Sequence, residues 1–340
     1  MNKIPENICI ATGIYPPEIG GPAEYARELF DSLLIQKYNV SVVTYGDLKK
    51  FPTGLRHILY FIKLVFDAFY ADYIIALDMF SVGLPAVIFS KIFGKKIVLR
   101  VGGDFLWESY IERTKEQILL SEFYLAPRKL STKEEIIFSL TKFVLRNVFA
   151  VVFSTDWQRK IMEEPYDLDL SKTKIIENFF PMPEMSSLQN SEPKIFLSPS
   201  RDIFIKNKKR LFEAFQKIKE KYPEIILDTE QVSHEVLLQK MSRAYAVIVN
   251  SFSEVSPNLV CDAIRYDLPV ILTTDNGLTE RLKDMVIFSN PFSVDDLMRS
   301  IETLLEPETY QNYKRNILLN SYSHSWDEIA QGFIDIYSKI

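Results

Sequence analysis

Residues 246–274, AVIVNSFSEVSPNLVCDAIRYDLPVILTT, contain the pattern that decides the fold. The run AVIVNS predicts a buried strand, and the run LPVILTT predicts a second one. The residues between them are enough for a loop that carries Glu254 and a helix that carries Asp262, eight positions later. A strand, a helical crossover and another strand form a unit in which the two strands are parallel.

The same alternation continues along the chain in both directions. A helical pattern follows the first strand at residues 23–34, AEYARELFDSLL. Since 340 residues are enough for two domains, we predict an α/β protein with two doubly wound, Rossmann-like domains. Ligands are then expected at the carboxyl ends of strands and in a deep interdomain cleft. Further strands are predicted at NICIAT (7–12), NVSVVTY (39–45), YIIALD (73–78), KKIVLRV (95–101), VFAVVFS (148–154), IFLSPS (195–200) and EIILDT (224–229).

A segment without apolar periodicity predicts the boundary between the two domains. Residues 183–194, PEMSSLQNSEPK, are rich in proline and serine and are interpreted as the linker. The N-terminal domain is predicted over 1–182 and the C-terminal domain over 195–324.

Composition excludes several classes of function. The formal net charge of −5 gives no reason to expect nucleic acid as a partner. Two cysteines, Cys9 and Cys261, are too few for a disulfide framework and have no metal-ligand spacing, so we expect buried thiols in a cytosolic protein. The stretch from Tyr73 to Ser90 contains Asp78 and is interpreted as strand, loop and helix rather than a membrane span.

Three short stretches carry candidate chemistry. Gly20-Gly21 precedes a helix start that could meet an anion, although such a loop can also be a mere connector. Arg201 and Lys206 follow a predicted strand and could pair with a diphosphate. Carboxylates accept hydrogen bonds from vicinal hydroxyls, so Glu254 and Asp262 are candidate sugar and ribose readers. The alternative for Asp262 is a favourable charge near a helix N-terminus.

Two further features leave alternatives open. Asp104, in RVGGDFLWE, follows a strand and either meets an acceptor or stabilises a turn. In the helix expected over 55–71, LRHILYFIKLVFDAFYA, a stripe of polar residues from Arg56 to Asp67 is surrounded by apolar ones, and we predict that the helix is well buried. The alternative for this helix is a surface that leans on lipid and admits a lipid-linked acceptor. The three histidines, His57, His234 and His324, form no cluster and predict surface or packing roles.

Taken in order, these features resemble the retaining glycosyltransferases of family 4, which have the GT-B fold. The resemblance covers nearly the whole chain and includes Gly20-Gly21, Arg201 with Lys206, and Glu254 with Asp262 at the positions of an E-x7-E element. It also includes DLPVILTTDNGLTE (267–280) and HSWDEIAQGFIDIY (324–337). This chain departs from the family in having Asp262 in place of Glu and Gly102-Gly103-Asp104 where a histidine is common. The segment between Lys206 and Glu254 is also shorter than in the family, so a helix and a strand usual in the second domain are expected to be missing.

The resemblance implies a hexosyltransferase that retains anomeric configuration and needs no metal or other cofactor. The donor would be a UDP- or GDP-linked sugar and the acceptor a glycan or lipid-linked glycan, in polysaccharide or glycolipid synthesis. Residues 325–340 would pack back on the N-terminal domain, which would touch the inner membrane face from the cytoplasm. The implied catalytic residues are Glu254, Arg201, Lys206 and Asp104, and the implied donor-binding residues are Gly20, Gly21, Asp262, Asn258, Asn276 and Gly277.

Two alternatives to this function remain at the level of the sequence. One is a GT-B-like subunit that has lost catalysis and serves a partner. The other is a sugar-nucleotide epimerase on the same fold. Arg201, Lys206 and Glu254 together argue against the inactive subunit, whereas Asp262 and the missing segment argue for keeping it as an alternative.

Overall fold

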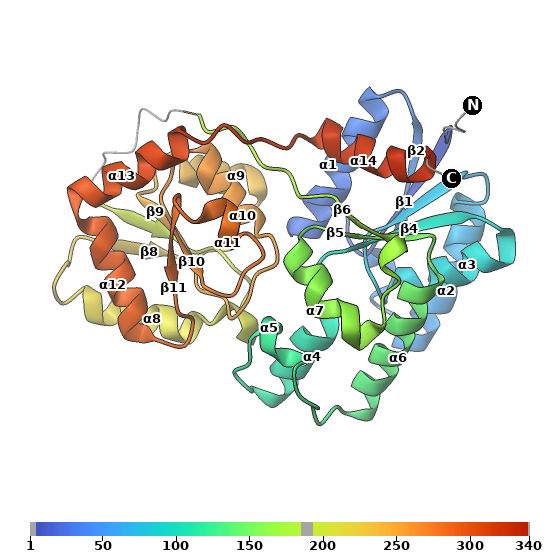
Figure 1. The fold of residues 1–340 in the computed structure, drawn as a ribbon, viewed down its shortest axis with the longest axis horizontal. Coiled ribbons are helices and arrows are strands. Elements are labelled where there is room, and N and C mark those ends of the chain that lie inside the picture. The colour runs from blue at the N-terminus through green and yellow to red at the C-terminus, as the bar shows by residue number, and fades with distance from the viewer. Residues whose placement is uncertain (1–4, 185–192, 339–340) are drawn as a thin grey trace. The chain divides into compact units, whose positions relative to one another are not determined.

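The computed structural model describes residues 5–184 and 193–338, which form two units (Figure 1). Unit 1 contains the described residues up to 106, with 129–178 and those from 324 onward. Unit 2 contains 107–128 and the described residues of 179–323. Residues 185–192 of the predicted linker lie outside the described residues.

Unit 1 is built on a parallel sheet of six strands in the order β2-β1-β3-β4-β5-β6. Its strands are β1 (Asn7–Thr12), β2 (Asn39–Thr44), β3 (Tyr73–Ala76), β4 (Lys96–Val101), β5 (Ala150–Phe153) and β6 (Thr173–Ile175). Its α-helices are α1 (Gly21–Ile35), α2 (Thr53–Asp67), α3 (Gly83–Phe93), α6 (Thr132–Asn147), α7 (Asp156–Tyr166) and α14 (Trp326–Ser338); α4 (Phe105–Thr114) starts here and continues into unit 2. Short 3-10 turns are η1 (Gly46–Leu48) and η2 (Leu170–Lys172).

Unit 2 is built on a parallel sheet of five strands in the order β11-β10-β9-β7-β8. Its strands are β7 (Ile195–Leu197), β8 (Ile226–Asp228), β9 (Ala246–Val249), β10 (Val270–Thr273) and β11 (Val286–Ser289). Its helices are α5 (Leu120–Phe123), η3 (Phe204–Lys206), α8 (Lys208–Ile218), α9 (His234–Met241), α10 (Asn258–Arg265), α11 (Thr279–Leu282), α12 (Val294–Leu305) and α13 (Pro307–Leu318).

The strands of unit 2 divide their side chains between two hydrophobic cores. Phe196 of β7 and Ile248 of β9 lie in the core that α8 and α12 cover. Their chain neighbours Leu197 and Val249 lie in the other core, which includes residues of α9 and α10. Successive residues of a strand point to opposite faces, so a strand buried on both faces must be apolar throughout. The unbroken apolar runs of the sequence are explained by this requirement.

The predicted α/β class with two doubly wound parallel sheets is confirmed. The sequence-based boundaries put residues 107–128 with the N-terminal half, whereas their contacts assign them to unit 2. Glu112 Oε2 accepts from the Phe204 backbone N–H at 2.9 Å, and the Leu120 N–H donates to Ser253 Oγ at 2.8 Å. These hydrogen bonds join segments about a hundred residues apart.

Helix α2 is not buried as predicted. Two of its polar residues point inward: the Tyr60 hydroxyl donates to the Val43 carbonyl at 2.8 Å, and Lys63 Nζ donates to the Thr44 carbonyl at 3.2 Å. Both acceptors lie at the end of β2, an edge strand of the sheet. The opposite side of α2 is exposed and apolar, with Leu55, Ile58, Ile62 and Phe66. The prediction was wrong because it assumed that an apolar helix must be covered by protein on every side.

Helix α14 closes unit 1 by packing against α1, as Figure 1 shows. Asp327 accepts from Ser32 Oγ at 2.7 Å, and Tyr73 donates to the Phe333 carbonyl at 3.0 Å. The Phe333 side chain is fully buried. Removing it leaves a cavity beneath the helix.

We therefore expect Phe333→Ala to lower the free energy of unfolding by about 3–5 kcal/mol, the usual cost of deleting a buried aromatic ring. Urea unfolding followed by circular dichroism measures this change. Gln331→Ala, at an exposed position of the same helix, is the matched control and should change stability by no more than about 0.5 kcal/mol. Equal effects of the two substitutions would show that the α14 face is not part of the core.

Candidate functional site

An ion pair between Lys206 and Glu254 is the centre of the candidate site. Lys206 ends the turn η3 in the loop after β7, and Glu254 lies in the loop after β9. These two strands are hydrogen-bonded neighbours in the sheet, so their carboxyl-end loops meet. Lys206 Nζ lies 2.6 Å from Glu254 Oε1, and both side chains are largely buried. The structure thus brings together two residues that are 48 positions apart.

The backbone of Glu254 is held on both sides by the loop after β10. Its N–H donates to the Asp275 carbonyl at 3.0 Å, and its carbonyl accepts from the Gly277 N–H at 3.0 Å. An isolated parallel bridge joins Glu254 to Asn276. The carboxylate is therefore presented from a backbone that is hydrogen-bonded on both sides.

The hydrogen bonds of the Glu254 carboxylate are unequally shared between its oxygens. Lys206 and the Ser251 hydroxyl both donate to Oε1, at 2.6 Å each. None of the described residues forms a hydrogen bond or ion pair with Oε2. A carboxylate can accept about four hydrogen bonds and an ammonium has three donors. The pair can therefore accept from a ligand hydroxyl at Oε2 while Lys206 also donates to an anion.

Asp262 forms a second pair, with a residue for which the sequence predicted only a surface or packing role. Its Oδ2 lies 3.0 Å from Nε2 of His234, the first residue of α9. Ser233 caps this helix by accepting from the Val236 N–H. No local pattern connects His234 to Asp262, which lies 28 positions later in α10, so only the fold could reveal the pair. Beside Asp262, burial raises the pKa of the Cys261 thiol to about 12, which keeps it protonated and unreactive.

The other predicted residues of unit 2 differ in their accessibility. Arg201 is exposed in the loop after β7, and Asn258 is exposed as the first residue of α10. Asn276 is buried, and both ends of its amide are engaged with backbone: Nδ2 donates to Thr273 at 2.7 Å and Oδ1 accepts from Leu278 at 2.9 Å. Its amide therefore shapes the turn that holds Glu254, and partly buried Gly277 completes that turn.

Three predicted residues belong to unit 1. Gly20 has φ of +150°, a backbone conformation that side chains of L-residues rarely adopt, and its carbonyl accepts from the Ala23 and Glu24 N–H groups at the start of α1. Gly21, the first residue of α1, is exposed. Asp104 has only 1% of its surface exposed and immediately precedes α4. Its burial favours the alternative in which it stabilises the turn.

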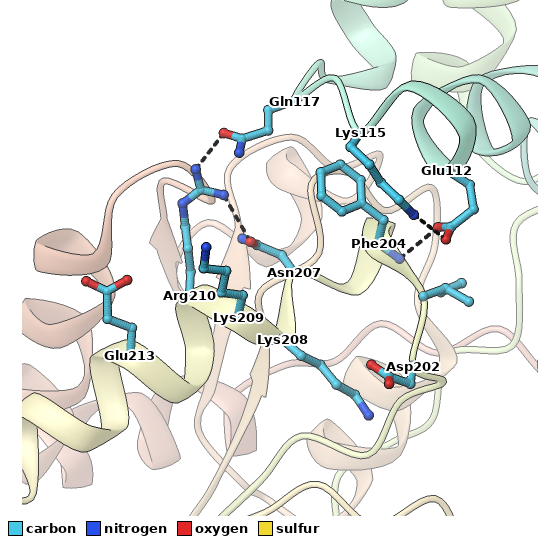
Figure 2. Close-up of a pocket in the computed structure, with 11 residues that line it drawn as sticks. Glu112, Lys115, Gln117, Asp202, Phe204, Asn207, Lys208, Lys209, Arg210 and Glu213 are labelled. Carbon is cyan, nitrogen blue, oxygen red and sulfur yellow. Dashed lines mark hydrogen bonds and ion pairs between the residues drawn. The ribbon is translucent and has the colours of Figure 1, made fainter.

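A cavity of about 430 Å³ in unit 2 is lined by residues on both sides of Lys206 in the sequence, including Phe204 and Asn207 (Figure 2). The segment 107–128 forms one wall with Glu112, Lys115 and Gln117, and residues 202–204, 207–210 and 213 form the other. Figure 2 shows Arg210 reaching Gln117 at 2.5 Å across this space. Lys115 hydrogen-bonds Glu112 and lowers the pKa of that carboxyl. Neither Lys206 nor Glu254 lines the cavity, so the candidate site rests on the ion pair itself.

Two kinds of feature are absent from the described residues. Within 5–184 and 193–338, no three His, Cys, Asp or Glu side chains gather as a group that could hold a metal ion. No helix in this part of the chain has the length and apolar character needed to cross a membrane.

Comparison with solved structures identifies the fold. Sucrose-phosphate synthase from Thermosynechococcus elongatus superposes with a TM-score of 0.73 at 16% identity, over 98% of both chains. Anabaena HepE in complex with UDP and glucose gives 0.67 at 15% identity, over 98% of this chain and all of that one. WaaG, a glycosyltransferase involved in lipopolysaccharide biosynthesis, gives 0.68 at 14% identity, over 97% and 99%.

The chain therefore has the GT-B fold, and the predicted resemblance is confirmed at that level. Identities of this size establish the fold alone. No protein-family model matches the sequence, and no curated protein matches it.

Proposed function

We propose that the protein is a retaining glycosyltransferase that moves a hexose from a UDP- or GDP-linked donor to a glycan or lipid-linked acceptor. The observation that carries the proposal is the ion pair of Lys206 with Glu254, at 2.6 Å, at the carboxyl ends of β7 and β9. In doubly wound sheets this edge is where ligands bind. The fold agrees, because its structural neighbours include HepE in complexes with UDP and with UDP-glucose.

The proposed roles follow from the donors and acceptors that the pair leaves available. Lys206 would donate to the diphosphate and stabilise the negative charge that grows there as the sugar leaves. Glu254 would accept from hydroxyls of the transferred sugar through Oε2, while Oε1 stays with Lys206 and Ser251. Exposed Arg201, five residues before Lys206, would add a second cation to the phosphates. The sugar would then be held against the leaving group throughout transfer.

Asp262 and His234 are proposed to read the ribose. An aspartate reaches one methylene less far than the glutamate common in the family, so its orientation matters more. His234 holds one carboxylate oxygen of Asp262 at 3.0 Å and thereby limits the directions in which the other can point. Both side chains are partly accessible, as a ligand contact requires.

The alternatives to the proposed transferase are the catalytically inactive subunit and the sugar-nucleotide epimerase.

Glu254→Gln tests the proposed reaction. The amide keeps the size of the side chain but weakens a charged contact to the sugar, which should lower transfer by about 30- to 1000-fold. Thermal stabilisation by UDP, GDP and ADP first identifies the nucleotide, and the variant should bind that nucleotide nearly as the parent does. Release of nucleotide from its sugar donors, with and without candidate acceptors, then measures turnover.

Glu308→Gln, at an exposed position of α13, is the matched control and should retain parental activity. Transfer at the parental rate by Glu254→Gln would assign Glu254 a structural role. Isomerisation of the free sugar nucleotide would identify the epimerase instead. Absence of any nucleotide binding would favour the inactive subunit.

Asp262→Ala should weaken nucleotide binding by about tenfold or more, because it removes a charged hydrogen-bond acceptor. Asp262→Glu should keep or raise affinity, and His234→Ala should lower it less than Asp262→Ala does. Calorimetric titration measures each variant with the nucleotide and with its 2′-deoxy form. If Asp262 binds the ribose, the effects of Asp262→Ala and of the missing hydroxyl overlap and do not add. Parental affinity in Asp262→Ala would leave the pair with a structural role only.

A further inference from the structure

Segment 107–128 of unit 2 forms hydrogen bonds with both of the loops that carry the ion pair of the candidate site. Glu112 Oε2 accepts from the Phe204 N–H at 2.9 Å. Phe204 is the first residue of η3, the turn that ends in the lysine of the pair. Further along the segment, the Leu120 N–H donates to Ser253 Oγ at 2.8 Å, and Ser253 directly precedes the glutamate of the pair. The two loops are thus joined through the segment as well as through the pairing of β7 with β9.

Ser253 and Asp275 connect the segment to the backbone of Glu254. The Ser253 hydroxyl donates to Asp275 Oδ2 while it accepts from the Leu120 N–H. The Ser121 N–H donates to the same carboxylate oxygen at 3.4 Å. The Asp275 carbonyl in turn accepts from the Glu254 N–H at 3.0 Å. Ser253 and Asp275 have only 3% and 8% of their surface exposed, and hydrogen bonds to a carboxylate are stronger than those between neutral groups. An unbroken chain of hydrogen bonds therefore leads from the segment to Glu254.

The contact with Phe204 is reinforced by Lys115. The ammonium group of Lys115 hydrogen-bonds the Glu112 carboxylate, as Figure 2 shows, and lies over the Phe204 ring at 5.1 Å from the ring centroid. This ion pair lowers the pKa of Glu112, so the carboxylate that accepts from Phe204 is charged at neutral pH. The Phe204 ring also contacts the Phe252 ring at 5.2 Å between centroids, and the Phe252 N–H donates to the Ile205 carbonyl at 2.9 Å. The two loops are therefore in direct contact beside the residues that the segment binds.

The partners in these contacts are distant in the sequence. The residue before η3 is Ile203, whose side chain has no acceptor for the Phe204 N–H, and Glu112 supplies one from 92 positions away. Leu120 and Ser253 are 133 positions apart. A fully satisfied network of polar contacts favours one arrangement of the groups that it connects. A catalytic pair needs such support, because a displacement of about 1 Å can cost about 100-fold in rate.

We propose that segment 107–128 positions the ion pair of Lys206 with Glu254, and that Ser253 and Asp275 are the positioning residues through which it acts on Glu254. The segment fixes the separation of the two loops and thereby keeps the contact of 2.6 Å between the paired side chains. The effect of this positioning on transfer rests on the proposed function, whereas its effect on the loops can be measured without any substrate.

Ser253→Ala removes the hydroxyl that joins Leu120 to Asp275. We expect kcat for transfer to fall by about 10- to 100-fold, because a catalytic group displaced by up to about 1 Å loses rate on that scale. Affinity for the nucleoside diphosphate should stay near the parental value, since Lys206 lies in the other loop. Hydrogen exchange followed by mass spectrometry should be faster in peptides that contain Glu254, and urea unfolding checks that the variant is folded.

Glu112→Ala and Glu112→Gln test the contact with the other loop. The alanine variant removes the acceptor for the Phe204 N–H and should lower kcat less than Ser253→Ala does, because Glu112 is exposed. The glutamine variant keeps an acceptor oxygen and should recover most of the loss. If the segment acts as one element, either alanine substitution already releases it, so the two losses should not multiply in the double variant Glu112→Ala with Ser253→Ala.

Glu122→Ala is the matched control, because Glu122 is an exposed glutamate of the same segment, and it should keep the parental kcat and exchange. Parental exchange of the Glu254 peptides in Ser253→Ala overturns the proposal, whether or not the protein transfers a sugar. In an active protein, a parental kcat in Ser253→Ala, or losses that multiply in the double variant, overturn it as well. Faster exchange in Ser253→Ala together with a parent that transfers no sugar supports the positioning and contradicts the proposed function.

Discussion

Parallel pairing of every strand is the constraint on which the rest of the structure depends. All pairs in both sheets are parallel, so each connection must cross a face of its sheet, and the helices of these crossings cover both faces. The carboxyl ends of the strands then lie along one edge. Loops that are far apart in the sequence meet there when their strands are neighbours. The contacts of Glu254 with Lys206 and with Asp275 arise in this way, because β9 lies between β7 and β10.

This constraint explains how much could be predicted from the sequence. Unbroken apolar runs such as AVIV, between helical segments, are sufficient to predict strands buried on both faces. Polar residues that follow such runs predict a site at the carboxyl edge, and this pattern selects both Lys206 and Glu254 as candidates. What periodicity cannot give is the order of strands in the sheet. The partner of a given loop therefore stays unknown until the fold is seen.

The pair of His234 with Asp262 and the position of residues 107–128 show this limit. His234 begins α9, after the edge strand β8, and nothing in its local sequence distinguishes it from a surface histidine. Residues 107–128 interrupt unit 1 in the sequence, yet hydrogen bonds to Phe204 and Ser253 join them to unit 2. Both cases depend on contacts between segments that are distant in sequence, which no local pattern contains.

Helix α2 shows a different limit, because its pattern was visible but its orientation was not. Strand β2 is an edge strand, and the carbonyl groups of Val43 and Thr44 at its end need donors. Tyr60 and Lys63 supply those donors, so these two polar side chains of α2 face the sheet. Leu64 is buried on the same side, and the apolar residues on the opposite side, from Leu55 to Phe66, are left exposed. The exposed apolar side of α2 thus follows from the hydrogen bonds that the end of β2 receives. Apolar side chains in water have an unfavourable hydration free energy, which is relieved when another surface covers them.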